Sequence, residues 1–203
     1  MPNSCAIPSE LSAVILAGGE SSRLGRDKAF LRVGGRALIE RAVAELSTVC
    51  AEIFISSNRP EPFRGLGVTD IVPDVPPGLG PLGGIQAGLR AITNDYGFFV
   101  ACDMPFLSAA VIREQIDRLR ADPCDALVPR WDGRTEPLHA IYGTACLPAV
   151  ERCLGRGKRK IITFYDAVRV AYWDLAPAEK WERYFQNINT EDDLRTLRPL
   201  LDP

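Results

Sequence analysis

The chain lacks the features that mark membrane, secreted and nucleic-acid-binding proteins. No apolar run approaches the roughly 20 residues that a transmembrane helix needs. Residues 1–10 have neither a cationic start nor the apolar segment of a signal peptide. The net charge is −2, whereas nucleic-acid-binding domains are usually basic. We therefore expect a cytoplasmic protein with neither a membrane nor a nucleic acid as a partner.

Histidine is scarce and the cysteines are scattered. The 203 residues include one histidine, His139, and six cysteines, none of them in a Cys-x-x-Cys pair. A zinc site is therefore not expected, and a cytoplasmic setting favours free thiols over disulfides. Cys102, which lies in an apolar run, is predicted to be a small core residue.

The residues that are present have an ordinary globular composition and an α/β pattern. With 46% hydrophobic and 25% charged residues, the length predicts one domain over residues 1–203. Short apolar runs alternate with segments of helical period, which predicts a largely parallel sheet covered by helices. Helices are expected over residues 37–47, after a Ser108 cap and after a Thr190 cap. The predicted strands are residues 13–16, 52–56, 67–72, 97–102, 126–129, 138–142 and 168–173.

The most informative stretch follows the first predicted strand, where residues 16–28 read LAGGESSRLGRDK. Glycines let backbone N–H groups approach an anion closely, and Arg23 and Lys28 would neutralise its charge. The stretch does not match the P-loop, because Gly25 is followed by Arg26, and it does not match the Gly-x-Gly-x-x-Gly pattern of dinucleotide sites. The glycines alone would suit a surface turn, but the two spaced cations favour a polyphosphate site.

This stretch resembles the signature Leu-Ala-Gly-Gly-x-Ser-x-Arg-x-Gly-x-Asp-Lys of the molybdenum cofactor guanylyltransferases, which join GMP from GTP to molybdopterin. Cytidylyl-transferring relatives usually have Leu-Ala-Ala-Gly, and sugar nucleotidyltransferases continue into Glu-x-Pro-Lys, so Gly18 and the pair Asp27 and Lys28 point to the guanylyl branch. The resemblance extends over residues 13–194 and implies a three-layer, Rossmann-like α/β sandwich with a mostly parallel central sheet. The signature matches at Leu16, Ala17, Gly18, Gly19, Ser21, Arg23, Gly25, Asp27 and Lys28.

A second constellation is Asp103, which ends the apolar run at residues 97–102. Ligands of parallel α/β sheets bind outside the carboxyl ends of the strands, and Mg²⁺ prefers one or two carboxylates together with phosphates and water. Taken alone, Asp103 is equally compatible with a turn before Pro105. The family has its metal-binding aspartate in an Asp-x-Pro motif here, so the resemblance implies Mg²⁺, or Mn²⁺ in its place, on Asp103.

Asp74 follows a third predicted strand, at a point where the family uses an aspartate near the nucleotide. A carboxylate can accept hydrogen bonds from N1–H and the exocyclic amine of guanine, whereas a solvated turn residue is the alternative. The family often has Asn-x-Asn after the second strand; here Ser56 replaces the first amide and Asn58 is kept, which leaves a contact at Ser56 open.

Residues 78–83 formally match Gly-x-Gly-x-x-Gly, but prolines precede the glycines and Pro81 lies among them, which argues against an NAD-binding oxidoreductase. The segment instead resembles the family's Gly-Pro-Leu-x-Gly-Ile stretch, which would begin a helix whose free N–H groups face the nucleotide. The predicted nucleotide-binding residues are Leu16, Ala17, Gly18, Gly19, Lys28, Ser56, Asn58, Asp74, Gly80, Pro81 and Leu82.

Two further segments are candidates for the pterin side of the site. Residues 152–160 carry five cations, which would suit a phosphate on molybdopterin but would equally suit a solvated surface. Asn187 and Asn189 alternate and could face one pocket, or could belong to a turn before the helix that Thr190 caps. The predicted pterin-side residues are Asn187, Asn189, Arg156 and Lys158.

The resemblance implies that the terminal phosphate of molybdopterin attacks the α-phosphorus of GTP and that pyrophosphate leaves. Such a reaction depends mainly on alignment and charge neutralisation, so the predicted catalytic residues are Arg23, Lys28 and Asp103. The alternatives are a nucleotidyltransferase that uses CTP or another acceptor, and a module that binds GTP without transferring it. The sequence leaves open whether a molybdenum-inserting protein or an apo-molybdoenzyme docks on the same surface.

Overall fold

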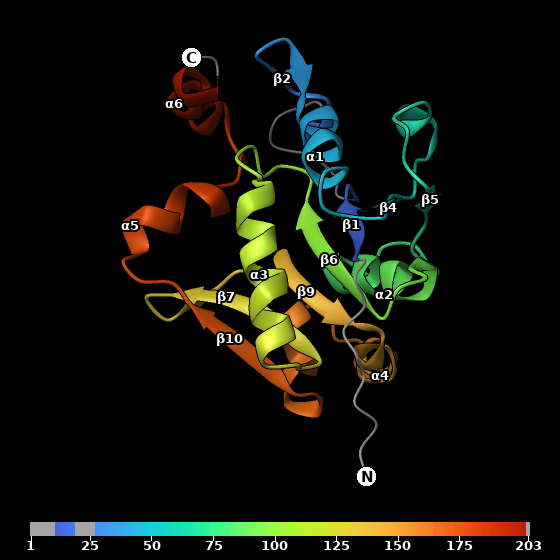
Figure 1. Cartoon of the computed structure of the whole chain (residues 1–203). Coiled ribbons are helices and arrows are strands. Elements are labelled where there is room, and N and C mark those ends of the chain that lie inside the picture. Colours follow the sequence, from blue (N-terminus) through green and yellow to red (C-terminus); the bar gives the residue numbers. More distant parts are fainter. Residues whose placement is uncertain (1–10, 19–26, 202–203) are drawn as a thin grey trace.

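The first predicted strand lies in the middle of a sheet in a computed structural model that describes residues 11–18 and 27–201 (Figure 1). β1 (Ser12–Leu16) is buried along its whole length, as expected for a short run of apolar residues between two neighbouring strands. It pairs in parallel with β4 (Glu52–Ser56) on one side and with β6 (Tyr96–Ala101) on the other.

The carboxyl ends of these strands meet at one edge of the sheet. Leu16 is in register with Ser56 on β4 and with Ala101 on β6. β5 (Asp70–Val72) continues the sheet beyond β4, also in parallel. It is shorter than the predicted 67–72, because Gly67 has a φ of 71° and therefore belongs to a left-handed turn. The strand ends therefore share one edge of the sheet, as the sequence predicted.

The other half of the sheet is mixed. β9 (His139–Gly143) runs antiparallel between β6 and β7 (Ala126–Trp131), and β10 (Val170–Asp174) pairs in parallel with β7. The short β8 (Arg134–Thr135) forms a hairpin with β7. Of the eight strands that the described residues contribute to this sheet, only β8 and β9 run against the others, so the sheet is mostly parallel as predicted.

Helices cover both faces of the sheet, which gives the three predicted layers. Ala13 and Ile15 of β1 belong to a core cluster that includes α1 (Leu38–Leu46) and α3 (Ala109–Ala121). The alternate β1 residues Val14 and Leu16 belong to a second cluster with α2 (Pro81–Ala91) and α4 (Leu147–Gly155). This separation follows from the period of two along a strand.

The C-terminal segment returns to the first half of the chain. After α5 (Ala178–Trp181), α6 (Glu191–Leu201) packs against the hairpin of β2 (Arg32–Val33) and β3 (Arg36–Ala37). Ile188 and Leu31 both belong to this small cluster, so the segment before α6 lies beside the turn that follows the glycine-rich stretch. The 3₁₀ helices are η1 (Lys28–Phe30), η2 (Glu61–Phe63), η3 (Thr144–Cys146), η4 (Ile161–Ala167) and η5 (Glu182–Phe185).

One of the two predicted helix caps is confirmed and one is wrong. Thr190 Oγ1 accepts a hydrogen bond from the Asp193 backbone N–H at 3.1 Å, and Asp193 Oδ2 accepts one from the Thr190 backbone N–H at 2.8 Å. Ser108 occupies the cap position of α3, but its side chain caps nothing. Glu45 of α1 accepts from the Ala109 backbone N–H at 3.0 Å, so a tertiary contact satisfies one free N–H of the first turn.

No helix in the described part of the chain has the length and apolar character needed to cross a bilayer.

Candidate functional site

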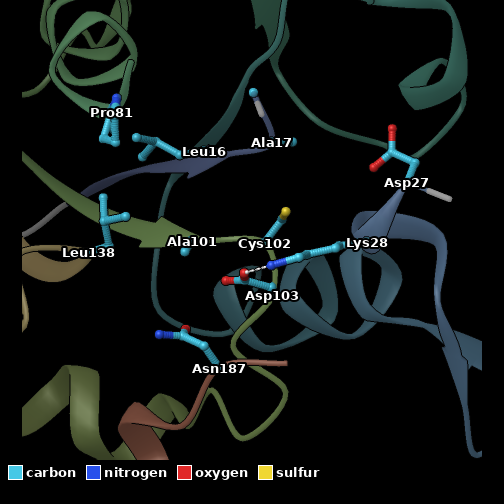
Figure 2. Close-up of a pocket in the computed structure, with 11 residues that line it drawn as sticks. Leu16, Ala17, Asp27, Lys28, Pro81, Ala101, Cys102, Asp103, Leu138 and Asn187 are labelled. Atoms are coloured by element: carbon cyan, nitrogen blue, oxygen red, sulfur yellow. Dashed lines mark hydrogen bonds and ion pairs between the residues drawn. The ribbon is translucent and has the colours of Figure 1, made fainter. Parts of the chain in front are cut away.

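A pocket of about 240 Å³ opens at the carboxyl edge of the sheet (Figure 2). Its lining comes from the ends of β1 and β6, the turn at residues 27–28, the start of α2, and positions 138 and 187. These segments are far apart in sequence and meet because parallel strands end at a common edge. The predicted residues that line the pocket are Leu16, Ala17, Gly18, Lys28, Pro81, Asp103 and Asn187.

Lys28 and Asp103 form an ion pair inside this pocket. The Lys28 Nζ lies 3.0 Å from Asp103 Oδ2, as the dashed line in Figure 2 marks, and 2.7 Å from Asn189 Oδ1. The Ile188 backbone N–H donates to the Asp103 carbonyl at 2.9 Å, so the C-terminal segment is fastened beside the end of β6. The structure therefore brings two predicted catalytic residues and one predicted pterin-side residue together.

Asp27 places the backbone of Lys28. Its Oδ1 accepts from the Ala29 backbone N–H at 3.2 Å, which caps the 3₁₀ helix η1. Its Oδ2 lies 2.8 Å from Arg59 Nη2, in the loop after β4. Sequence reasoning used Asp27 only as part of the signature; the structure gives it a local role in fixing the turn that carries Lys28.

The glycine-rich stretch itself is described only in part. Gly19 and Arg23 lie outside the described residues. The Ala17 backbone N–H donates to the Ser56 carbonyl at 2.9 Å, so β1 stays paired with β4 up to this point. A Cβ added at Gly18 would meet only the Ser56 carbonyl oxygen, at 3.9 Å. Packing among the described residues therefore does not require glycine at position 18.

Ser56, Asn58 and Asp74 form a second group beside the pocket. Ser56 Oγ donates to Asp74 Oδ1 at 3.4 Å, and the Asp74 backbone N–H donates to Asn58 Oδ1 at 2.9 Å. Burial raises the pKa of the Asp74 carboxyl, and the contacts from Ser56 and Asn58 offset this only partly. The three predicted residues lie together, although they are not part of the lining of the pocket.

The start of α2 packs against this group. Gly80 has a φ of 68° and precedes Pro81, the first residue of the helix. A Cβ at Gly84 would lie 2.9 Å from Leu16 Cδ2 and 3.0 Å from Ser56 Oγ, so glycine is needed for the helix to approach β1 and β4. Leu82 is fully buried in the core, which leaves only its backbone for a ligand.

The predicted pterin-side residues divide into two sets. Asn187 lines the pocket, and its buried Oδ1 has no hydrogen-bond partner among the described residues. Arg156 and Lys158 are exposed at the end of α4 and are not brought into the pocket. Their neighbour Arg159 hydrogen-bonds to the Gly78 carbonyl, so the basic run approaches the loop before α2.

Glu136 contacts a residue that lines the pocket, and sequence reasoning assigned it no role. Burial raises the pKa of this carboxyl to about 7, and the negative charge of Asp103 adds to the effect. Glu136 Oε1 accepts from the Leu138 backbone N–H at 3.1 Å, and Leu138 lines the pocket.

Cys102 packs against the core cluster, as predicted, but it has a second position as well. It is partly exposed and lines the pocket between the end of β6 and Asp103 (Figure 2). Burial is the main reason why the pKa of its thiol is raised, and the negative charge of Asp103 adds to it. The thiol is therefore protonated at neutral pH and is a poor nucleophile.

Comparison with known proteins places the chain in a family. A family model described as the MobA-like NTP transferase domain matches residues 13–170. The chain is 38% identical over 196 residues to a probable molybdenum cofactor guanylyltransferase of Pelotomaculum thermopropionicum, covering 95% of this chain and 94% of the relative. It is 35% identical over 190 residues to the molybdenum cofactor guanylyltransferase of Syntrophotalea carbinolica, covering 92% and 90%.

Solved structures agree with this assignment. The molybdopterin-guanine dinucleotide biosynthesis protein A of Archaeoglobus fulgidus superposes with a TM-score of 0.80 at 27% identity, covering 94% of this chain and 98% of that chain. The 2-C-methyl-D-erythritol 4-phosphate cytidylyltransferase of Thermus thermophilus superposes with a TM-score of 0.69 at 21% identity, covering 94% and 98%. The latter likeness supports the fold alone.

Proposed function

Since this chain belongs to the molybdenum cofactor guanylyltransferase family of nucleotidyltransferases, we propose that it transfers GMP from GTP to the terminal phosphate of molybdopterin. An acceptor phosphate oxygen attacks the α-phosphorus of GTP, the bond from that phosphorus to the oxygen of the β-phosphate breaks, and pyrophosphate leaves. The observation that carries the proposal is the meeting of Lys28 and Asp103 at a pocket on the ligand edge of the sheet.

Of the two predicted phosphate-binding cations, Lys28 lies within the described residues, and it would bind the β- and γ-phosphates. Its ammonium lies at the pocket, and its turn is fixed by Asp27. Charge neutralisation of the leaving pyrophosphate is the main contribution a side chain makes to such a reaction. Arg23 is proposed to share this role on the strength of the signature alone. No general base is needed, because a phosphate monoester is ionised near neutral pH.

Asp103 and Asn189 fit a hard divalent cation. Their oxygens Oδ2 and Oδ1 both contact a positive charge, the ammonium of Lys28. No cluster of three or more His, Cys, Asp and Glu side chains that could hold a metal occurs in the described ranges. This donor set suits Mg²⁺, or Mn²⁺, which takes few protein ligands and completes its shell with phosphates and water. The metal would supply charge neutralisation on the phosphates.

Asp74 is proposed to select guanine. A carboxylate accepts hydrogen bonds from both N1–H and the exocyclic amine of guanine, and cytosine does not present this pair of donors. Ser56 Oγ contacts one carboxylate oxygen and so orients the group toward the base. On the acceptor side, Asn187 would contact the pterin, and the exposed Arg156 and Lys158 would attract its phosphate from outside the pocket. Asn189, predicted for the pterin side, is proposed to serve the metal instead.

The test is pyrophosphate release from GTP and, separately, from CTP, with Mg²⁺ and with or without molybdopterin. The expected result is that pyrophosphate is released from GTP but not from CTP, and only when molybdopterin is present. Preference for CTP would overturn the role of Asp74 while leaving the reaction class intact. GTP binding without release would contradict catalysis and would favour a binding module. The proposal includes action in the cytoplasm and docking of a molybdenum-inserting protein or an apo-molybdoenzyme.

A further inference from the structure

The ammonium of Lys28 lies against the same oxygens that would hold the metal. It is 3.0 Å from Asp103 Oδ2 and 2.7 Å from Asn189 Oδ1. The side chains of Lys28 and Asp103 are only 21% and 17% exposed, so solvent screens this pair incompletely. A divalent cation on Asp103 and the ammonium in this position would compete for the same negative charge.

The fold fixes the backbone of Lys28 as well as the backbones of its two partners, Asp103 and Asn189. On one side, the Asp27 cap sets the turn of η1 and Asp27 also pairs with Arg59. On the other side, the Ile188 backbone N–H bonds to the Asp103 carbonyl, and Ile188 is fully buried in the cluster with α6. The backbones carrying Lys28, Asp103 and Asn189 are thus held at fixed positions, and only the long Lys28 side chain has to move.

We infer that Lys28 is the resting counter-ion of Asp103, which keeps a divalent cation off this carboxylate until a triphosphate draws the ammonium away. The inference rests on the proposed function, because it takes the metal on Asp103 and the triphosphate on Lys28 from there. It adds an order of events: the triphosphate releases Asp103 by giving the ammonium stronger, more highly charged partners. Triphosphate and metal then raise each other's affinity by the same factor, since binding linkage is reciprocal.

The first test measures Mn²⁺ binding without nucleotide, by the electron paramagnetic resonance signal of free Mn²⁺. Lys28→Met keeps most of the side chain's length but removes its charge, so Mn²⁺ should bind at least tenfold more tightly than to the wild type. The control is Lys180→Met, which removes a charge from α5, where Lys180 lies over the Trp181 ring at 4.6 Å. This control should leave Mn²⁺ binding unchanged.

Asp103→Asn separates the two ways in which the inference can fail. Added to Lys28→Met, it should abolish the gain in Mn²⁺ affinity. If Mn²⁺ binding is lost with Asp103→Asn but is no tighter in Lys28→Met, the metal site stands and the counter-ion inference is wrong. If Mn²⁺ binding does not depend on Asp103 at all, the metal site of the proposed function is wrong and the inference falls with it.

A second measurement uses the wild-type protein and so does not depend on a variant folding. A brief pulse of an acetylating reagent, followed by mass spectrometry, reports how accessible each lysine amine is. Saturating Mg²⁺ without nucleotide should raise acetylation of Lys28 severalfold relative to Lys180, because the displaced ammonium leaves its two oxygen partners. Equal acetylation of Lys28 with and without Mg²⁺ would overturn the inference.

Discussion

Partly buried carboxyls at the two ends of the central sheet differ in how far hydrogen bonds offset the effect of burial on their pKa. At the amino end, Glu52 accepts hydrogen bonds from Ser12 Oγ at 2.5 Å and from the Thr93 backbone N–H and hydroxyl at 2.7 and 3.0 Å. Burial acts to raise the pKa of Glu52, but these hydrogen bonds outweigh it and hold the pKa below its usual value. This end is a closed, satisfied network.

At the carboxyl end, the carboxyls of Asp74 and Glu136 accept too few hydrogen bonds to offset their burial. Burial raises the pKa of Asp74, and it raises the pKa of Glu136 to about 7. Buried acids with incompletely satisfied charge are typical of sites that bind ligands. The comparison indicates that the amino ends of these strands contribute to stability, whereas their carboxyl ends carry the proposed site, so substitutions at the two ends should have different consequences.

The largest expected effect is on turnover at the carboxyl end. Lys28→Ala should lower the rate of pyrophosphate release by about a hundredfold or more, because removing one charge-stabilising donor typically costs this much. The free energy of unfolding should change little, since an amine at a pocket packs few apolar atoms. Enzyme assays and thermal unfolding measure the two quantities side by side, with Lys180→Ala as the charge-matched control. If the Lys28→Ala protein fails to fold, Lys28 has a structural role and the proposed site is misplaced.

The next effect is a pH dependence of stability that comes from His139, the buried first residue of β9. His139 is fully buried between the rings of Phe98 and Phe185, with centroids 4.8 Å away, and burial lowers its pKa to about 4. The unfolded chain, with a histidine pKa near 6.5, binds more protons between these values, so stability falls as the pH drops from about 6.5 to 4. The loss attributable to His139 should be about 3 kcal/mol.

Denaturant unfolding of the wild type and of His139→Leu across this pH range isolates the contribution of His139. Glu136 acts with the opposite sign, because its raised pKa makes the folded state bind more protons between its usual value of 4.5 and about 7. That contribution is present in both proteins and cancels in their difference. Parallel curves for the two proteins would show that His139 does not titrate in this way.

The smallest effect is at the amino end. Glu52→Gln should lower the free energy of unfolding by about 1–2 kcal/mol, because it weakens hydrogen bonds to a charged acceptor, and it should leave turnover unchanged. The stability that Glu52 supplies exists above its unfolded pKa and is lost as the pH falls through its lower folded pKa. Chemical denaturation measures the change. If Glu52→Gln lowered turnover without lowering stability, the proposed difference between the two ends of the sheet would be wrong.

Local patterns in the sequence predicted much of this fold. The runs that became β1, β4 and β6 were found because several apolar residues in a row, followed by glycine or a polar residue, mark a buried strand. The Thr190 cap was predictable because its acceptor lies three residues from its donor. Ser108 makes no side-chain cap hydrogen bond. The Ala109 N–H of the same turn is bonded by Glu45, 64 residues earlier, and no local pattern encodes such a contact. The hairpin of β2 and β3 has strands too short to leave a periodic signal.

The candidate site divides in the same way. Asp103 and Lys28 were predicted because each belongs to a local motif, whereas their mutual contact spans 75 residues and the Lys28–Asn189 contact spans 161. Glu136 received no role because a raised pKa depends on burial and on the charge of a distant aspartate. Arg156 and Lys158, chosen from a charge run, remain exposed outside the pocket.

The sequence by itself determined most of the strands and helices along the chain, the glycine-rich signature and the family to which the chain belongs, because these reside in neighbouring residues. Only the tertiary structure decided which charges face one another. It closed the network around Glu52 with Ser12 and Thr93, and it set the Lys28 ammonium on Asp103 and Asn189. The physical reason is that burial and Coulombic interaction depend on distance in space, which the packing of strands and helices sets and the spacing of residues along the chain does not.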